Sequence, residues 1–259
     1  MNAGEFRTAL GERRVLVGSW IQANSPTVAE VLADAGFDWI GVDMEHTEIG
    51  IESLAALLRA MRGRGTNPIV RVPTNDVMDI RRALDAGAGG VLVPLTSTAE
   101  QARGAVRAAK YPPAGVRGFA FCRANGWGAD FQDYAARADA ETAVIVMIET
   151  REGVENIDAI LEVDGVDGVF IGPYDLSGSY GIPGQTSHPL VREACARVAD
   201  ACGRHDRSAG LHVVIPDDEA IRNAIDDGFN LVCLGVDVVF VRRGAAAALA
   251  SARKLKETR

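Results

Sequence analysis

The sequence is poor in lysine and in clusters of positive charge. Only three lysines occur among 259 residues, Lys110, Lys254 and Lys256, and the formal net charge is −8 at pH 7. A surface that binds nucleic acid or an anionic membrane normally gathers basic residues. The composition therefore argues against both partners and favours a protein that acts on small molecules.

Long apolar runs are missing as well. The sequence contains no stretch of about 18 apolar residues, the length needed to cross a membrane. The first residues, MNAGEFRTALGERR, lack the apolar segment of a signal peptide. The four cysteines form no CxxC pair, and no histidine stands at zinc-finger spacing. We therefore expect a cytoplasmic protein whose cysteines are ordinary buried or surface thiols.

Short apolar runs alternate with amphipathic segments along the chain, as in a parallel sheet covered by helices. Eight strands are expected, at residues 15–21, 37–42, 68–72, 90–94, 143–148, 168–171, 209–215 and 230–234. Helices are expected at residues 26–35, 51–62, 76–86, 98–110, 131–138, 154–161 and 238–256. This pattern predicts an α/β protein with a single (β/α)8 TIM-barrel domain over residues 1–259. An open doubly wound sheet is the alternative, but GSWIQANSP after the first strand supplies no glycine-rich dinucleotide turn.

Residues 111–130, YPPAGVRGFAFCRANGWGAD, interrupt this rhythm with glycine, proline, arginine and aromatic residues. A long loop inside a compact domain usually carries a function or a binding surface.

Polar side chains lie at or just past the ends of several expected strands, where a barrel carries its active site. They are Trp20, Gln22, Asp43, Glu45, His46, Arg71, Glu149, Asp175 and His212. Because these strands are parallel, we expect most of these side chains to converge on one mouth.

Glu149 and Asp175 follow two neighbouring expected strands and suggest a site for a hard divalent cation, which prefers oxygen ligands. Glu149 closes the apolar strand VIVMI and needs a partner if it is buried. Asp175, in GPYDLS, has an alternative role as the cap of a short helix. Together the pair favours a metal site.

Arg71, His46 and Asp43 are the other candidates for chemistry. The Arg71 charge must meet an anion at the mouth or form a structural salt bridge. His46 is either a hydrogen-bonded structural residue or, with Asp43 three positions earlier, a catalytic base. His212 is open between pocket lining and core.

Seven strings resemble one known family: FDWIGVDMEH, IVRVP, LDAGAGGVLVP, TAEQA, YPPAGVRG, MIET and VDGVFIGPYDLS. The chain is similar from about Val15 to Asp237 to the HpcH/HpaI aldolases. These are metal-dependent class II pyruvate aldolases, such as 4-hydroxy-2-oxoheptanedioate aldolase and 2-keto-3-deoxy-L-rhamnonate aldolase. The chain departs from the heptanedioate enzymes in FAFCRANGWGADF and at Met147, where some members carry glutamine.

The resemblance implies that Glu149 and Asp175 bind Mg2+, Mn2+ or Co2+. It makes His46, supported by Asp43, the general acid/base and places Arg71 beside the substrate's keto oxygen. It also implies a hexamer, a trimer of dimers that exchange the C-terminal helix. No other cofactor is expected.

A retro-aldol mechanism is consistent with these residues. Cleavage of a 4-hydroxy-2-oxo acid to pyruvate and an aldehyde passes through a pyruvate enolate, which a divalent cation and Arg71 would stabilise. The substrate carboxylate could accept hydrogen bonds from the backbone N–H groups of Tyr174 and Asp175, at the start of a short helix after Gly172 and Pro173. Trp20 would line the aldehyde side. The rival Schiff-base mechanism needs a lysine inside the barrel, and none of the three lysines is expected there.

The sequence is compatible with three alternatives. A lyase for CoA thioesters of the malyl or citramalyl type would need a basic surface for the CoA phosphates. Decarboxylation of oxaloacetate could use the same metal site. A barrel protein that only binds a ligand is the third alternative, but it would not require Glu149, Asp175, His46 and Arg71 together.

Overall fold

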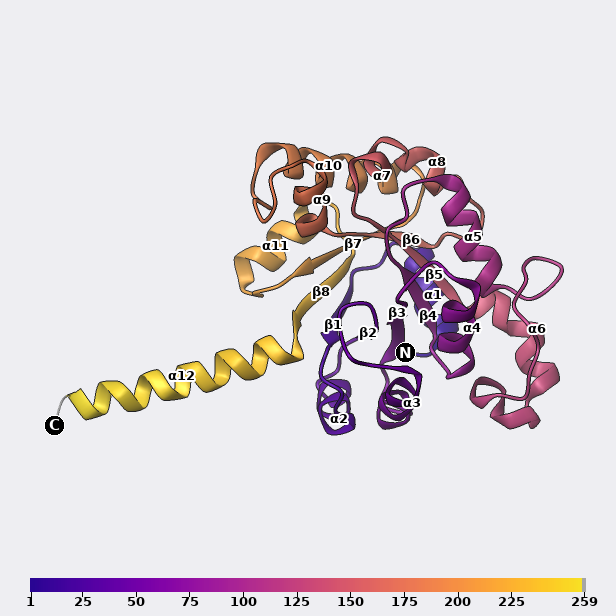
Figure 1. The fold of residues 1–259 in the computed structure, drawn as a ribbon, viewed down its shortest axis with the longest axis horizontal. Coiled ribbons are helices and arrows are strands. Elements are labelled where there is room, and N and C mark those ends of the chain that lie inside the picture. Colours follow the sequence, from indigo (N-terminus) through magenta and orange to yellow (C-terminus); the bar gives the residue numbers. More distant parts are fainter. Residues whose placement is uncertain (258–259) are drawn as a thin grey trace.

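The computed structural model describes residues 1–257 and contains a closed barrel of eight parallel strands (Figure 1). Each strand pairs with the next along the chain, and β8 pairs with β1. The strands are β1 (Leu16–Ile21), β2 (Trp39–Asp43), β3 (Asn67–Arg71), β4 (Gly90–Val93), β5 (Ala143–Ile148), β6 (Gly168–Ile171), β7 (Ser208–Val213) and β8 (Leu231–Val236). The predicted (β/α)8 fold is therefore confirmed, and every expected strand overlaps an observed one.

Helices cover the outside of the barrel. They are α2 (Pro26–Asp34), α3 (Ile51–Ala60), α4 (Val77–Asp85), α5 (Ala99–Ala109), α6 (Phe131–Glu141), α7 (Arg151–Glu155), α8 (Ile157–Leu161), α9 (Pro173–Ser179), α10 (Pro189–Arg204) and α11 (Asp218–Asp226). Most begin at a capping side chain; Ser25, for example, accepts a hydrogen bond from the Val28 N–H before Pro26 opens α2. Their apolar faces and the outward strand residues form the main core.

Aromatic rings fill the inside of the barrel. Trp20, Trp39 and Phe170 meet edge to face, with ring centroids 6.0 to 6.3 Å apart. The rings fit because inward positions on neighbouring strands are glycine: a Cβ on Gly41 would lie 2.4 Å from the Trp20 ring. A Cβ on Gly210 would lie 2.3 Å from the Phe170 ring. The barrel is thus packed below its mouth.

A short helix that the sequence analysis does not predict, α1 (Ala3–Gly11), closes the N-terminal end of the barrel. Asn2 and Glu5 form a capping box at its start. Phe6 and Leu10 are fully buried and belong to the same cluster as the barrel interior. This helix therefore seals the end opposite the mouth.

The irregular segment from Tyr111 to Asp130 includes a 3-10 turn, η1 (Arg123–Gly128), and packs beside α4 and α6. Its anchor is Arg117, which is 1% exposed, donates to Asp85 Oδ1 at 2.8 Å and lies over the ring of Tyr111. The side chains of Phe121 and Trp127 are exposed.

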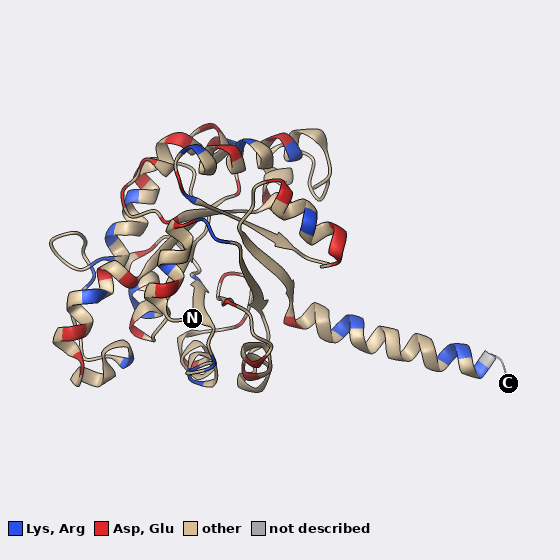
Figure 2. Ribbon diagram, turned by 180° about the vertical axis from the view of Figure 1, so that it is seen from behind, with Lys and Arg blue, Asp and Glu red and all other residues tan. Residues whose placement is uncertain are grey.

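The last helix, α12 (Asp237–Glu257), leaves the barrel and extends away from it (Figure 1). Val241, Leu249 and Leu255 are more than half exposed. Figure 2 shows basic residues near both ends of this helix, whereas acidic and basic residues are interspersed over the helices around the barrel. No helix within residues 1–257 is long and apolar enough to cross a membrane.

Candidate active site

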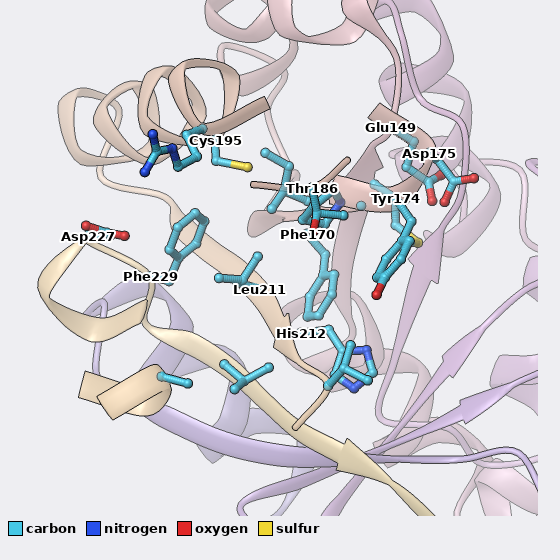
Figure 3. Close-up of a pocket in the computed structure, with 18 of the residues that line it drawn as sticks. Glu149, Phe170, Tyr174, Asp175, Thr186, Cys195, Leu211, His212, Asp227 and Phe229 are labelled. Carbon is cyan, nitrogen blue, oxygen red and sulfur yellow. The ribbon is translucent and has the colours of Figure 1, made fainter. Parts of the chain in front are cut away.

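A cavity of about 1270 Å3 opens at the C-terminal ends of the strands. One end is lined by polar residues of the barrel mouth, among them Trp20, Arg71, Glu149, Asp175 and His212. The other end runs between α10 and α11 past Cys195 and Phe229 (Figure 3). The expected convergence of strand-end side chains on one mouth is therefore present.

Glu149 follows β5 and is 3% exposed. Its Oε2 accepts a hydrogen bond from the Leu95 N–H at 2.8 Å. Gly172 leaves room for the side chain, because a Cβ at that position would lie 2.9 Å from Glu149 Oε1. Burial raises the pKa of Glu149 to about 7; the Leu95 hydrogen bond opposes this shift, and the charges of Glu45 and Asp175 add to it.

Asp175 lies in the first turn of α9, three residues after the N-cap Gly172. It accepts no hydrogen bond from any residue in the range 1–257, so it does not serve as the helix cap that the sequence left open. Its carboxylate lies next to that of Glu149 (Figure 3). Two carboxylates therefore face the cavity side by side, one buried and one exposed.

Glu45 adds a third negative charge to this pair. Burial raises the pKa of Glu45; the charge of Arg71 opposes the shift, and those of Asp43 and Asp175 add to it. Its Oε2 is buried and has no hydrogen-bond partner among the described residues. Arg71 Nε lies 3.4 Å from this oxygen and is the arginine that also pairs with Asp43. Three acids close to a single arginine favour the binding of a cation.

Protein side chains alone do not form a closed metal cage here. Within residues 1–257, no group of three or more histidine, cysteine or acidic side chains is positioned to hold a metal ion. This agrees with Mg2+ chemistry, in which one or two carboxylates, several waters and the substrate share the coordination sphere. The Glu149 and Asp175 pair fits such an open site.

Asp43 is the centre of a hydrogen-bond network beside these acids. It is fully buried, accepts two hydrogen bonds from Arg71 at 2.9 and 2.6 Å, and accepts one from Gln22 Nε2 at 3.0 Å. Burial by itself would raise the pKa of Asp43, but the hydrogen bond and charge of Arg71 outweigh it and hold the pKa below its usual value. Arg71 Cζ also lies 5.0 Å from the centroid of the Trp20 ring. Arg71 is thereby fixed at the mouth.

His46 lies at the edge of the site with a side chain that is 55% exposed. Asp43 Oδ1 accepts a hydrogen bond from the His46 backbone N–H at 3.2 Å and makes none with the ring. The ring Nε2 lies instead 3.4 Å from Glu45 Oε2. Asp43 was expected to orient the His46 ring, but it binds only the His46 backbone. Glu45 is the acid beside the ring.

Gly172, Pro173 and Tyr174 line the cavity next to Asp175. The Gly172 N–H is already used, because it donates to Ile148 O at 3.1 Å. Tyr174 is 61% exposed, and its ring lies along the cavity wall (Figure 3). The binding role expected of this segment stays a prediction.

His212 projects into the cavity from β7, so the choice between core and pocket lining is settled in favour of lining (Figure 3). Its Nε2 lies 2.9 Å from Gly235 O. Burial lowers the pKa of His212 to about 4, the bond to Gly235 opposes this, and the charge of Arg71 adds to it. The ring is thus neutral near pH 7.

Comparison with known proteins identifies the family. The model of the HpcH/HpaI aldolase/citrate lyase family matches residues 16–243. The chain belongs to this family. The resemblance noted in the sequence is therefore confirmed, over nearly the same residues.

Members of the HpcH/HpaI family with assigned activities align along most of the chain. The hydroxypyruvate/pyruvate aldolase of Roseobacter denitrificans is 40% identical over 238 residues, which cover 91% of this chain and 92% of that protein. The 4-hydroxy-2-oxo-heptane-1,7-dioate aldolase of Shigella sonnei is 38% identical, with 93% and 92% covered. A crystal structure of an HpcH/HpaI aldolase/citrate lyase family protein from Burkholderia cenocepacia superposes with a TM-score of 0.92 at 35% identity, covering 96% of this chain and 99% of that one.

Two residues of this HpcH/HpaI site escape sequence reasoning. Leu95 adopts a left-handed backbone with φ of 51°, which is uncommon for leucine and directs its N–H to Glu149. Phe170 forms part of the cavity wall from inside β6. A leucine in the sequence does not indicate a positive φ. Phe170, within the apolar run VFI, cannot be distinguished by sequence from an ordinary core residue.

Proposed function

We propose that the protein is a divalent-metal-dependent aldolase that reversibly cleaves a 4-hydroxy-2-oxo acid to pyruvate and an aldehyde. The main support is the meeting of an acidic pair, Glu149 and Asp175, with a fixed arginine at the mouth of a barrel of the HpcH/HpaI family. The names of the relatives, which include pyruvate aldolases, point to the same reaction.

Glu149 and Asp175 would hold the cation, which we expect to be Mg2+, Mn2+ or Co2+. Once bound, such a cation would draw negative charge from the keto oxygen and carboxylate of the 2-oxo acid. Their adjacent carboxylates support this assignment. Burial, and after it the charges of Glu45 and Asp175, raise the pKa of Glu149, and a bound cation would favour the ionised carboxylate against both effects.

Arg71 would bind the keto oxygen and stabilise the charge that develops there. Its Nε and one terminal nitrogen are committed to Asp43, so the remaining guanidinium N–H groups are left for substrate. Since Asp43 and Trp20 fix the guanidinium before substrate arrives, little reorganisation is needed.

His46 would take the proton from the C4 hydroxyl. The C3–C4 bond then breaks, its electron pair forms the enolate of pyruvate, and C4 leaves as an aldehyde. Protonation of the enolate at C3 gives pyruvate and balances the reaction. An exposed imidazole beside Glu45 suits this exchange with solvent and substrate.

α12 would pack against a second copy of the chain, within a hexamer built from dimers. Its exposed apolar side chains favour such a partner, because an isolated helix of this kind leaves its apolar surface in water.

The absence of a spanning helix within the described residues and the relatives' activities are compatible with the cytoplasmic location expected from the sequence.

Pyruvate release tests the function. The protein should cleave 4-hydroxy-2-oxopentanoate to pyruvate and acetaldehyde. The pyruvate is measured by the consumption of NADH in the presence of lactate dehydrogenase. EDTA should abolish release, and Mn2+, Co2+ or Mg2+ should restore it. Full activity in metal-free protein would contradict the proposed mechanism.

A further inference from the structure

His212 is a titratable group at the mouth of the barrel that the proposed mechanism does not use. It lies on β7, where alternate residues point inward: Ser208 and Gly210 face the barrel interior, so His212 does as well. Its neighbours inside the barrel include Cys233, which pairs with His212 in the register between β7 and β8. An imidazole among largely apolar interior side chains calls for an explanation beyond packing.

The hydrogen bond to Gly235 determines which nitrogen carries the proton. A carbonyl oxygen only accepts, so Nε2, at 2.9 Å from Gly235 O, must be the donor. A neutral ring then has no proton on Nδ1. Within residues 1–257, Nδ1 forms no hydrogen bond. The ring therefore offers the cavity a fixed acceptor.

This acceptor selects among ligand groups. It repels the carboxylate of a 2-oxo acid and cannot bond to a keto oxygen, because each of these groups only accepts. Water or a hydroxyl can donate to it. The polar groups around Arg71 and Glu149 are better suited to the shared 2-oxo acid portion, which leaves His212 for a part that differs between substrates.

We propose that His212 is a specificity-determining residue whose Nδ1 accepts a hydrogen bond from a substrate hydroxyl adjacent to the bond that is made or broken. The inference rests on the proposed function and deepens it by naming the substrate class. That hydroxyl is either on C3 of the oxo acid, as in hydroxypyruvate, or on C2 of the aldehyde, as in glycolaldehyde. A hydroxylated substrate is then preferred over its deoxy counterpart.

Two pairs of substrates distinguish these positions. Hydroxypyruvate and pyruvate are compared with acetaldehyde as the fixed acceptor, and glycolaldehyde and acetaldehyde are compared with pyruvate as the fixed nucleophile. The kcat/KM ratio of each pair is measured in the wild type, His212→Leu and His212→Gln. His205→Leu is the matched control, because His205 is bonded to Asp158 on the outside of the barrel.

His212→Leu should lower one of the two ratios by roughly threefold to tenfold, the usual effect of one neutral hydrogen bond. His212→Gln, whose amide can both donate to Gly235 and accept from the hydroxyl, should give an intermediate ratio. His205→Leu should leave both ratios at the wild-type value. Equal ratios in all four proteins would overturn the proposal.

Calorimetry separates this inference from the function itself. Binding of hydroxypyruvate and pyruvate to the Mn2+-loaded wild type and His212→Leu requires no turnover. A preference for hydroxypyruvate that disappears in His212→Leu would support the C3 position even if the wild type made no aldol product. No aldol product together with equal binding of the two acids in both proteins would reject function and inference alike.

Discussion

Arg71 and Asp43 are register partners on β3 and β2 and form a two-point ion pair inside the barrel mouth. Nε donates to Oδ1 at 2.9 Å, and a terminal nitrogen donates to Oδ2 at 2.6 Å. This parallel geometry fixes the plane of the guanidinium as well as its position. Neither residue can therefore be changed without disturbing the other.

Replacement of Arg71 should affect both turnover and stability. Arg71→Ala should lower kcat/KM at least about 100-fold, since it removes the positive charge expected at the keto oxygen. It should also destabilise the protein by about 3–5 kcal/mol, because Asp43 is left buried without its partner. Pyruvate release and urea unfolding measure the two effects.

Arg71→Lys is the matched control for this variant. It keeps a positive charge but loses the planar fork, so stability should recover more than turnover does. Near-normal turnover in Arg71→Ala would remove Arg71 from the active site.

The stability of metal-free protein should depend on Glu149 in a defined pH range. The pKa of Glu149 is about 7 in the folded protein against an ordinary value of 4.5. A raised pKa means that its contribution is fully present below 4.5 and is lost as the pH rises through about 7. The loss amounts to as much as about 3 kcal/mol, since each pKa unit corresponds to about 1.4 kcal/mol.

The measurement compares melting temperatures of EDTA-treated wild type and Glu149→Gln between about pH 5 and 8. The glutamine stays neutral, so the wild type should lose stability relative to the variant as the pH rises. Saturating Mn2+ should reverse the trend in the wild type, because the cation binds the ionised carboxylate. Parallel pH profiles without metal would show that Glu149 is not desolvated in solution.

His46→Ala should reduce turnover about 10²- to 10⁴-fold, the usual contribution of a general acid/base. Metal affinity should remain within a few-fold of wild type, since His46 is not expected to be a ligand. His188→Ala, a change at the N-cap of α10, is the control and should retain turnover. If His46→Ala turned over at the wild-type rate, Glu45, 3.4 Å from the ring, would become the candidate base.

The sequence predicted the barrel because its apolar runs are local signals, and strand direction places every strand end at one mouth. For that reason Arg71, Glu149 and Asp175 could be expected at one mouth, where they line the cavity. The helix α1 was not predicted, since its few apolar residues acquire a partner only when the barrel has closed above it. The alternation of apolar and polar residues along the sequence likewise cannot predict the conformation of a loop.

The arrangement of the β2–α3 loop illustrates that second limit. Asp43 and His46 were expected to meet through the imidazole ring, but Asp43 is occupied by Arg71 and by backbone N–H groups of the loop. Which acid reaches the ring depends on how the loop turns after β2. In that turn Asp43 accepts from the Glu45 and His46 backbone N–H groups, and the Met44 N–H donates to Arg71 O on β3. Sequence spacing therefore placed Asp43 and His46 in one loop but did not predict that Glu45 would lie beside the ring.

Removal of α12 tests the proposed exchange between subunits. The helix extends away from the barrel with Val241, Leu249 and Leu255 exposed. A chain ending at residue 243 should lose the hexameric mass in light scattering and expose apolar surface. A matched variant that keeps the length, Leu249→Glu with Leu255→Glu, should weaken assembly in the same direction. If the full-length chain is monomeric, or if the truncated chain keeps the full-length mass, α12 does not hold subunits together.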